Sequence, residues 1–257
     1  MAPDSMPSIF DTPAFNSRLF FPRPVASPPP LGARDARIAV APGVSVHLRV
    51  HSAPAARALV LLFHGNGEIV ADYDAAAADY AAVGARLAVM DYRGYGASDG
   101  VPTLRSSLAD AHLVLSAARA ASSLPLIIMG RSLGSACAAE LARTTPAPAG
   151  LILESGFTDL HRLLRRRGLE LGGPLSDDDH AAFEPLHKLG ASAAPLLVLH
   201  GALDTLIVPA EASAAHDAAG TTDKRLIFIP GRGHNDISAH PLYWASLRSF
   251  LDHVTAG

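Results

Sequence analysis

Short apolar runs alternate with longer alanine-rich segments along most of the chain. The runs are ALVLLFH, RLAVMDY, LPLIIMG, GLILES, PLLVLHG and RLIFIPG, at 58–64, 86–92, 124–130, 150–155, 195–201 and 225–231. Continuous apolar runs of this length are typical of strands that are buried on both faces. The segments between them predict helices near 72–84, 104–121, 132–144, 158–168, 209–219 and 239–254. Strands that alternate with helices predict a parallel sheet covered on both faces.

Three segments depart from this alternation. Residues 1–36 are rich in proline and show no periodicity, so we expect an irregular N-terminal segment there. Residues 37–51 alternate apolar and polar positions on both sides of Pro42-Gly43 and predict a β-hairpin. The interval 156–194 is the longest between two strands, and we expect a small lid there, made of a helix, the stretch GGPLSDDDH and a second short helix.

These elements together predict one α/β fold. We expect a mostly parallel, eight-stranded, doubly wound sheet with an N-terminal β-hairpin and a small lid. A chain of 257 residues in which 49% are hydrophobic is long enough to bury one substantial core. No internal repeat or linker interrupts the pattern, so we expect a single domain over 37–257.

Charge and composition exclude several classes of protein. A net charge of −3 gives no electrostatic reason to expect a nucleic acid as partner. No apolar run is long enough to predict a transmembrane helix and no secretory signal is visible, so we expect a cytoplasmic protein. The basic run RLLRRRG at 162–168 is typical of a solvated helix face. The single cysteine, Cys137, lies in the apolar stretch SACAAEL and is expected to be a small core residue.

Two stretches fit the pattern G-x-S-x-G, namely GASDG at 96–100 and GRSLG at 130–134. A nucleophile elbow needs a strand, a sharp turn that carries the serine, and then a helix. The sequence LPLIIMGRSLGSACAAELAR supplies all three around Ser132. Around Ser98 the strand ends several residues earlier, and glycine and proline follow where a helix should begin. We therefore predict that Ser132 is a nucleophile and that Ser98 is a loop serine with a structural role.

A serine hydroxyl needs a base within hydrogen-bond reach, and the base needs an acid that orients it. His234 follows the last apolar run, where active-site loops of such sheets lie, and is the predicted base. Asp204 follows the preceding run and is the predicted acid, in the chain order Ser, Asp, His. Glu154 and Asp159 are rival acids, because they follow the strand before that.

The predicted nucleophile also needs two backbone N–H groups that face the developing oxyanion. We expect one from Leu133 and the other from Asn66, in a loop where Gly65 and Gly67 let the backbone turn inward. His64 is expected to brace this loop. Side chains that can line an apolar acyl pocket, or equally form ordinary core, are Leu133, Phe157, Leu163, Leu206, Ile207 and Ile237.

The stretches HGNGE, DYRGYGASDG, GRSLG, HGALDTLIVP and GRGHND resemble, in order and spacing, the motifs of the α/β-hydrolase superfamily. The ending GHNDI together with HGN and DYRGYG is most similar to the subgroup of BEM46-like and ABHD13- and ABHD17-like serine hydrolases. The resemblance implies a triad of Ser132, Asp204 and His234 and an oxyanion hole at Asn66 and Leu133. Acyl transfer through such a triad needs no metal or organic cofactor, and we expect none.

These observations favour a serine hydrolase that cleaves carboxylic esters or thioesters of a small-molecule or acylated substrate. An amidase or peptidase with the same triad is the first alternative, in which Glu68 or Glu154 could hold a substrate amine. A binding protein without catalysis is the second, because a fold does not fix a function. The sequence specifies neither the acyl and leaving groups nor the oligomeric state.

Overall fold

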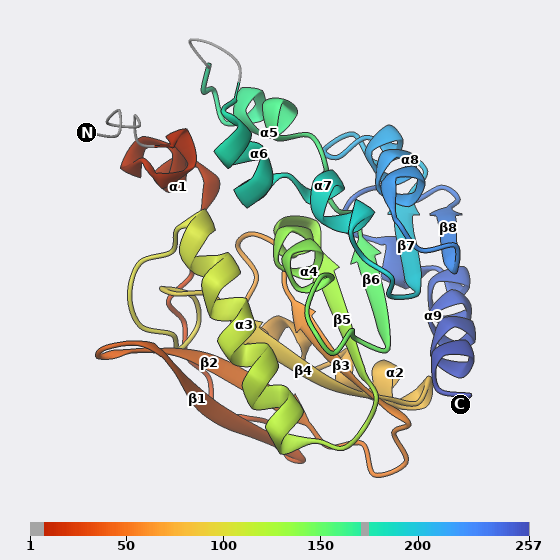
Figure 1. Cartoon of the computed structure of the whole chain (residues 1–257). Helices are drawn as coiled ribbons and strands as arrows, with labels where there is room; N and C mark the ends of the chain where they lie inside the picture. The colour runs from red at the N-terminus through yellow and green to blue at the C-terminus, as the bar shows by residue number, and fades with distance from the viewer. Residues whose placement is uncertain (1–7, 171–174, 257) are drawn as a thin grey trace.

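A computed structural model describes residues 8–170 and 175–256. Within these residues, eight strands form a single sheet in the order β1-β2-β4-β3-β5-β6-β7-β8 (Figure 1). Their bounds are β1 Ala33–Ala41, β2 Val44–His51, β3 Ala58–Phe63, β4 Ala85–Asp91, β5 Leu126–Arg131, β6 Gly150–Glu154, β7 Leu196–Gly201 and β8 Lys224–Ile229. β1, β2 and β4 pair antiparallel, and every pair from β4 to β8 is parallel. The predicted mostly parallel, eight-stranded sheet with an N-terminal hairpin is confirmed.

Helices cover both faces of this sheet. The described α-helices are α1 Pro13–Leu19, α2 Ala77–Ala82, α3 Leu104–Ala121, α4 Ser135–Leu141, α5 Leu160–Arg166, α6 Asp177–Phe183, α7 Pro185–Gly190, α8 Pro209–Ala218 and α9 Pro241–Val254. Short 3₁₀ turns are η1 Ile9–Asp11, η2 Val70–Tyr73, η3 Ser132–Gly134 and η4 Ile237–Ala239. Residues of α3, α4 and α8 belong to one buried cluster, and residues of α2 and α9 belong to a second. The sheet therefore separates two apolar cores.

The central strands are buried along their whole length. Every residue of β3, β5, β6 and β7 is buried, which explains why these strands are continuous apolar runs in the sequence. None of the described helices is long and apolar enough to cross a bilayer.

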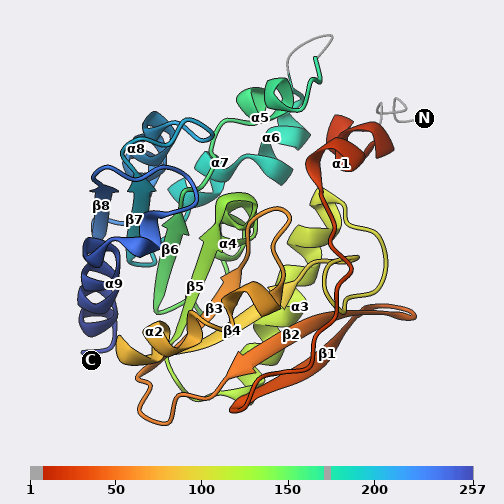
Figure 2. The ribbon, with the colours of Figure 1, turned by 180° about the vertical axis from the view of Figure 1, so that it is seen from behind.

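Two expectations about irregular segments need correction. Part of the N-terminal segment is helical, because Thr12 caps α1 by accepting a hydrogen bond from the Phe15 N–H, and Pro13 occupies the first helical position. The hairpin begins at Ala33, earlier than predicted. Residues 20–32 then run from α1 along the molecule to β1, as Figure 2 shows.

The interval 156–194 holds three described helices, where the sequence predicted two. The extra helix, α6, begins inside the stretch GGPLSDDDH, which was expected to lie between the two helices. Ser176 caps α6 by accepting a hydrogen bond from the Asp179 N–H. The acidic residues in the first turn also stabilise the helix, because they lie at the positive end of its dipole. α1, α5 and α6 lie at the same end of the molecule in both views (Figures 1 and 2). The ring centroids of Phe10 and Phe183 are 4.7 Å apart, and this contact connects α6 to the N-terminal segment.

The prediction of one domain with a lid stays a prediction.

Candidate active site

Ser132 lies in a sharp turn between β5 and α4. Its φ angle is 49°, in the left-handed region that a residue with a side chain rarely adopts, at a typical cost of about 1–3 kcal/mol. The turn packs closely on the neighbouring strand, because a Cβ at Gly134 would lie 1.9 Å from the carbonyl oxygen of Phe63. A Cβ at Gly130 would lie 2.4 Å from the carbonyl oxygen of Gly134. Both glycines are therefore needed for the strand, turn and helix to approach this closely.

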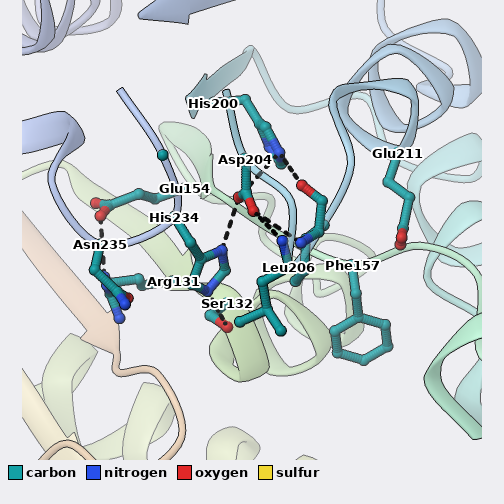
Figure 3. Close-up of polar contacts among 12 residues, drawn as sticks. Arg131, Ser132, Glu154, Phe157, His200, Asp204, Leu206, Glu211, His234 and Asn235 are labelled. Carbon is teal, nitrogen blue, oxygen red and sulfur yellow. Dashed lines mark hydrogen bonds and ion pairs between the residues drawn. The ribbon is translucent and has the colours of Figure 1, made fainter. Parts of the chain in front are cut away.

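His234 lies between Ser132 and Asp204 (Figure 3). Its Nε2 is 3.0 Å from Ser132 Oγ, and its Nδ1 is 2.7 Å from Asp204 Oδ2. Because a carboxylate only accepts hydrogen bonds, Nδ1 carries the proton and Nε2 is left to accept from the serine hydroxyl. The structure thus brings together three residues that lie far apart in the sequence.

Asp204 is buried and held from several directions. Its Oδ1 accepts from the backbone N–H groups of Leu206 and Ile207, at 2.9 and 2.8 Å. Its Oδ2 also lies 3.3 Å from Nε2 of His200, which donates to the carbonyl oxygen of Ile207 at 2.8 Å. Burial alone would raise the pKa of Asp204, but hydrogen bonds from His200, His234 and the Ile207 N–H lower it below its usual range. Asp204 is therefore a carboxylate at neutral pH.

The rival residues have other roles in the described structure. Ser98 donates its hydroxyl to the carbonyl oxygen of Asp91 at 2.8 Å and accepts from the His47 N–H, which is a structural role. Asp159 caps α5 by accepting from the Arg162 N–H. Glu154 lies with Arg131, away from the imidazole of His234 in Figure 3.

Asn66 and Leu133, the two predicted oxyanion donors, line the same pocket as Ser132. Among the described residues, no acceptor binds the backbone N–H of Asn66. The side chain of Asn66 fixes its loop, because its Oδ1 accepts from the Tyr95 hydroxyl at 2.7 Å and from the Phe21 N–H at 2.9 Å. Its Nδ2 donates to the carbonyl oxygen of Leu19. The N-terminal segment is thereby attached to the rim of the pocket.

His64 braces this loop from inside the protein. It is fully buried, and its Nδ1 donates to the carbonyl oxygen of Gly65 at 2.7 Å. Its Nε2 lies 3.4 Å from Oδ1 of Asp91. His47 lies on the other oxygen of the same carboxylate, with Nδ1 2.9 Å from Asp91 Oδ2. Burial would raise the pKa of Asp91, but the two histidines and the Val70 N–H lower it to about 2.

Arg131 joins three loops of the site, a role that was not predicted from the sequence. Its Nη2 donates to Oδ1 of Asn235 at 2.9 Å, beside His234. Its Nη1 donates to Glu68, whose other oxygen accepts from the Gly65 N–H at 2.7 Å. Its Nε donates to Oε1 of Glu154 at 3.2 Å. Burial would lower the pKa of this guanidinium, but the carboxylates of Glu154 and Glu68 raise it above its usual value.

The position of Arg131, one residue before Ser132, was the only signal in the sequence that could have indicated this role. Its partners Glu68 and Asn235 are 63 and 104 residues away along the chain. Glu68 lies two residues after Asn66, and Asn235 directly follows His234. Through its contacts with Glu68 and Asn235, Arg131 therefore sets the relative position of the serine turn, the Asn66 loop and the His234 loop.

A pocket of about 190 Å³ opens beside Ser132. Its lining residues are Leu19, Asn66, Ser132, Leu133, Phe157, Leu163, Arg166, Arg167, Leu206 and Ile207. Five of the six predicted apolar positions line it. Ile237 does not, because it packs in the other core with residues of α9. The basic run at 162–168 also differs from the expected solvated face, since Arg166 and Arg167 face this pocket.

No group of three or more His, Cys, Asp or Glu side chains within residues 8–170 and 175–256 is placed to hold a metal ion. Cys137 is buried, and burial raises the pKa of its thiol far above its usual range. Its thiol is therefore protonated and lies in the core, as expected.

Solved structures with the same fold include two esterases. The Pyrococcus furiosus esterase Pf2001 superposes with a TM-score of 0.73 at 15% identity, over 91% of this chain and 99% of the other. The esterase Est1E of Butyrivibrio proteoclasticus, solved with ferulic acid bound, superposes with a TM-score of 0.71 at 18% identity, over 86% of this chain and all of the other (100%). At these identities the likeness establishes the fold.

Sequence comparison identifies relatives over a large part of the chain. Residues 54–175 match a family described as serine aminopeptidase, S33. The human alpha/beta hydrolase domain-containing protein 17C is 28% identical over 213 residues, which are 79% of this chain and 61% of that protein. The uncharacterized protein Rv2307c of Mycobacterium tuberculosis is 35% identical over 159 residues, which are 60% of this chain and 54% of that protein.

The chain thus spans between half and two thirds of the length of these curated relatives. The predicted resemblance to ABHD17-like proteins is confirmed by the match to protein 17C, and the predicted fold by the structural neighbours. The chain has the α/β-hydrolase fold and is similar in sequence to alpha/beta hydrolase domain-containing protein 17C.

Proposed function

We propose that this protein is a serine hydrolase that cleaves carboxylic esters or thioesters through an acyl-enzyme intermediate. One observation carries the proposal: Ser132, in a strained turn, lies 3.0 Å from a His234 imidazole that a buried carboxylate orients at 2.7 Å. This arrangement lets a neutral imidazole accept the serine proton as the hydroxyl attacks. A cytoplasmic location and a small or acylated substrate stay predictions from the sequence.

In the proposed acylation step, Ser132 Oγ attacks the acyl carbonyl carbon while His234 Nε2 takes the hydroxyl proton. The carbonyl oxygen becomes negatively charged, and the backbone N–H groups of Asn66 and Leu133 would stabilise it. The tetrahedral intermediate then collapses, and the C–O or C–S bond to the leaving group breaks. His234 delivers its proton to the departing alkoxide or thiolate, and the acyl group remains on Ser132.

Deacylation repeats the steps of acylation, with water in place of the serine hydroxyl as the nucleophile. His234 Nε2 takes a proton from the water as its oxygen attacks the acyl carbon, and it returns that proton to Ser132 Oγ as the acid leaves. Asp204 stays ionised throughout, since it accepts several hydrogen bonds that favour its charged form. Its role is to hold the tautomer of His234 and to stabilise the imidazolium in both steps.

The charges around Ser132 favour an ester or thioester substrate. They disfavour an amide or peptide substrate that also carries a free amine, because such an amine needs an acidic partner in the protein. Glu68 and Glu154 were the candidate partners for such an amine, but both bind Arg131. The pocket beside Ser132 contains two arginines and no acidic residue among its described lining. A cationic amine would therefore find no acidic partner in this pocket.

The proposal is tested by comparing matched substrates with one acyl group. We expect hydrolysis of 4-nitrophenyl butanoate and of a butanoyl thioester, with much slower cleavage of the butanoyl anilide. Ser132→Ala should lower kcat/KM for the ester by a factor of about 10³ or more. Ser98→Ala is the matched control, because it removes the serine of the other G-x-S-x-G stretch, and it should retain a substantial part of the activity.

Equal rates for anilide and ester would favour the amidase alternative. Full activity in Ser132→Ala would exclude the proposed nucleophile. Binding of the esters without turnover in the wild type would favour a protein that binds and does not catalyse.

A further inference from the structure

The two arginines in the pocket beside Ser132 differ in how their charges are balanced. Arg166 donates to Oε1 of Glu211 through its Nη2. Glu211 is itself buried and accepts from the Thr158 N–H at 2.8 Å through its other oxygen. The charge of Arg166 is thus neutralised by a carboxylate that α8 holds in place. This pair is complete without a ligand.

Arg167 has no such partner among the described residues. No described carboxylate forms an ion pair with Arg167. The Arg167 side chain also donates no hydrogen bond to any described residue. Its Nε is buried without an acceptor. The guanidinium lies over the ring of Phe21, 5.2 Å from the centroid, which fixes its plane without neutralising its charge.

Arg167 is half-buried, and its surroundings disfavour its charge. Burial and the neighbouring Arg166 both lower the pKa of Arg167, although a guanidinium stays protonated at neutral pH. A half-buried cation loses part of its hydration, and no described carboxylate compensates that loss here. An anion that enters the pocket would supply both the missing charge and the missing hydrogen-bond acceptors.

We propose that Arg167 binds an anionic group of the substrate, a carboxylate or a phosphate, in the pocket next to Ser132. The inference rests on the proposed hydrolase function and defines the substrate class of the same site. The flat fork of N–H donors on arginine matches two oxygens of either anion. The apolar side chains of Leu133, Phe157 and Leu206 would contact the carbon chain between the anion and the scissile bond.

The pocket places this anion near the reacting carbonyl. Ser132 and Arg167 line the same pocket of about 190 Å³. The test substrates therefore carry the anion a few bonds away from the scissile bond. The anion can belong to the acyl part or to the leaving group, and the two sources are distinguished by substrate pairs.

The first pair places the charge on the acyl part. Ethyl hydrogen glutarate carries a terminal carboxylate, and ethyl 5-methylhexanoate carries a neutral isopropyl group in its place. The second pair places the charge on the leaving group, with 2-(butanoyloxy)ethyl phosphate and the neutral 3,3-dimethylbutyl butanoate. Released ethanol is measured for the first pair and released butanoate for the second.

We expect the wild type to prefer the anionic member of at least one pair by tenfold or more in kcat/KM. Arg167→Met, which retains the apolar stem over Phe21, should abolish that preference, because kcat/KM for the anionic member should fall at least tenfold more than kcat/KM for the neutral member. Arg165→Met is the matched control, because it removes an exposed arginine of α5, the helix that ends just before Arg167, and should leave the preference intact. Equal losses on both members of each pair, or no anionic preference in either pair, would overturn the proposal.

A binding measurement separates this inference from the hydrolase proposal. In the Ser132→Ala background, which needs no turnover, ethyl hydrogen glutarate and 2-(butanoyloxy)ethyl phosphate are titrated by calorimetry. Adding Arg167→Met should weaken the binding of the preferred anion at least tenfold. Unchanged affinity for both anions would overturn the role of Arg167, even if the neutral esters are hydrolysed through Ser132.

Discussion

His200 places its Nε2 3.3 Å from Oδ2 of Asp204, the oxygen that also lies 2.7 Å from Nδ1 of His234. His200 is fully buried at the end of β7, and the same Nε2 donates to the carbonyl oxygen of Ile207. Because both neighbours of Nε2 are acceptors, this nitrogen carries the proton. A buried imidazole thus holds the carboxylate in the orientation that His234 requires.

Replacing His200 should slow catalysis without weakening substrate binding. His200→Phe retains the ring volume but removes the donor to Asp204 and Ile207. A hydrogen bond to a charged group typically contributes about 1.5–3 kcal/mol, so we expect kcat to fall by roughly tenfold to a hundredfold with KM nearly unchanged. Asp204→Asn should cost about 10⁴-fold, because it favours the wrong tautomer of His234. Steady-state kinetics on both variants shows whether His200→Phe loses less activity than Asp204→Asn. An unchanged kcat in His200→Phe would contradict the role of this histidine.

Arg131→Met should destabilise the fold and lower kcat. The change leaves Glu154 buried beside Tyr243 without its cation, and breaking a buried pair in this way typically costs about 3–5 kcal/mol. It also frees Glu68 and Asn235, which hold the loops of the site. Urea unfolding gives the free energy, and ester hydrolysis gives kcat.

The double variant Arg131→Met with Glu154→Gln separates these two effects. Removing the uncompensated carboxylate should restore much of the lost stability. Because neither loop is held again, kcat should stay low. Recovery of kcat together with stability would show that Arg131 acts on folding alone.

His47 should make stability depend on pH. Burial lowers its pKa, but the carboxylates of Asp91 and Asp35, 2.9 and 3.1 Å from its two ring nitrogens, raise it above its usual value. A pKa raised by folding adds stability that is complete below about pH 6.5, the unfolded value, and is lost as the pH rises through the folded value. His47→Gln should therefore lower the free energy of unfolding more at pH 5.5 than at pH 9.

Denaturant unfolding at the two pH values measures this difference. His253→Gln is the control, since it removes only an exposed contact with Asp223 and should cost less than about 1 kcal/mol. A cost for His47→Gln that is equal at both pH values, or larger at pH 9, would contradict the expected protonation.

Gly134→Ala should destabilise the protein by several kcal/mol, because the added methyl group overlaps the carbonyl oxygen of Phe63 at 1.9 Å and neither backbone can move freely. Gly233→Ala is the matched control, because the nearest atom to its Cβ would be 3.8 Å away. Thermal unfolding compares the two variants. Similar melting temperatures would mean that the serine turn is packed less closely than described.

The strands could be predicted from the sequence because burial on both faces leaves a continuous apolar run, as in β3 and β5. The positions of Ser132, Asp204 and His234 followed from the same pattern, since each comes directly after such a run. α1 and α6 were missed because they are short and depend on caps at Thr12 and Ser176 within proline-rich or acidic stretches.

The charged partners in the site could not be predicted, because an arginine or histidine on a helix or strand end is most often solvated. Only the folded chain shows that Arg131 reaches Asn235 across 104 positions. The same holds for Arg166 and Arg167, which belong to one basic run in the sequence but have different partners. Arg166 finds Glu211, 45 positions away, and Arg167 finds none among the described residues.

Labelling with a fluorophosphonate probe, followed by peptide mass mapping, shows whether Ser132 is the activated nucleophile. We expect one adduct, on the peptide that contains Ser132. This adduct should be absent in Ser132→Ala and much weaker in His234→Ala. An adduct on Ser98, or labelling that persists unchanged in Ser132→Ala, would exclude Ser132 as the nucleophile.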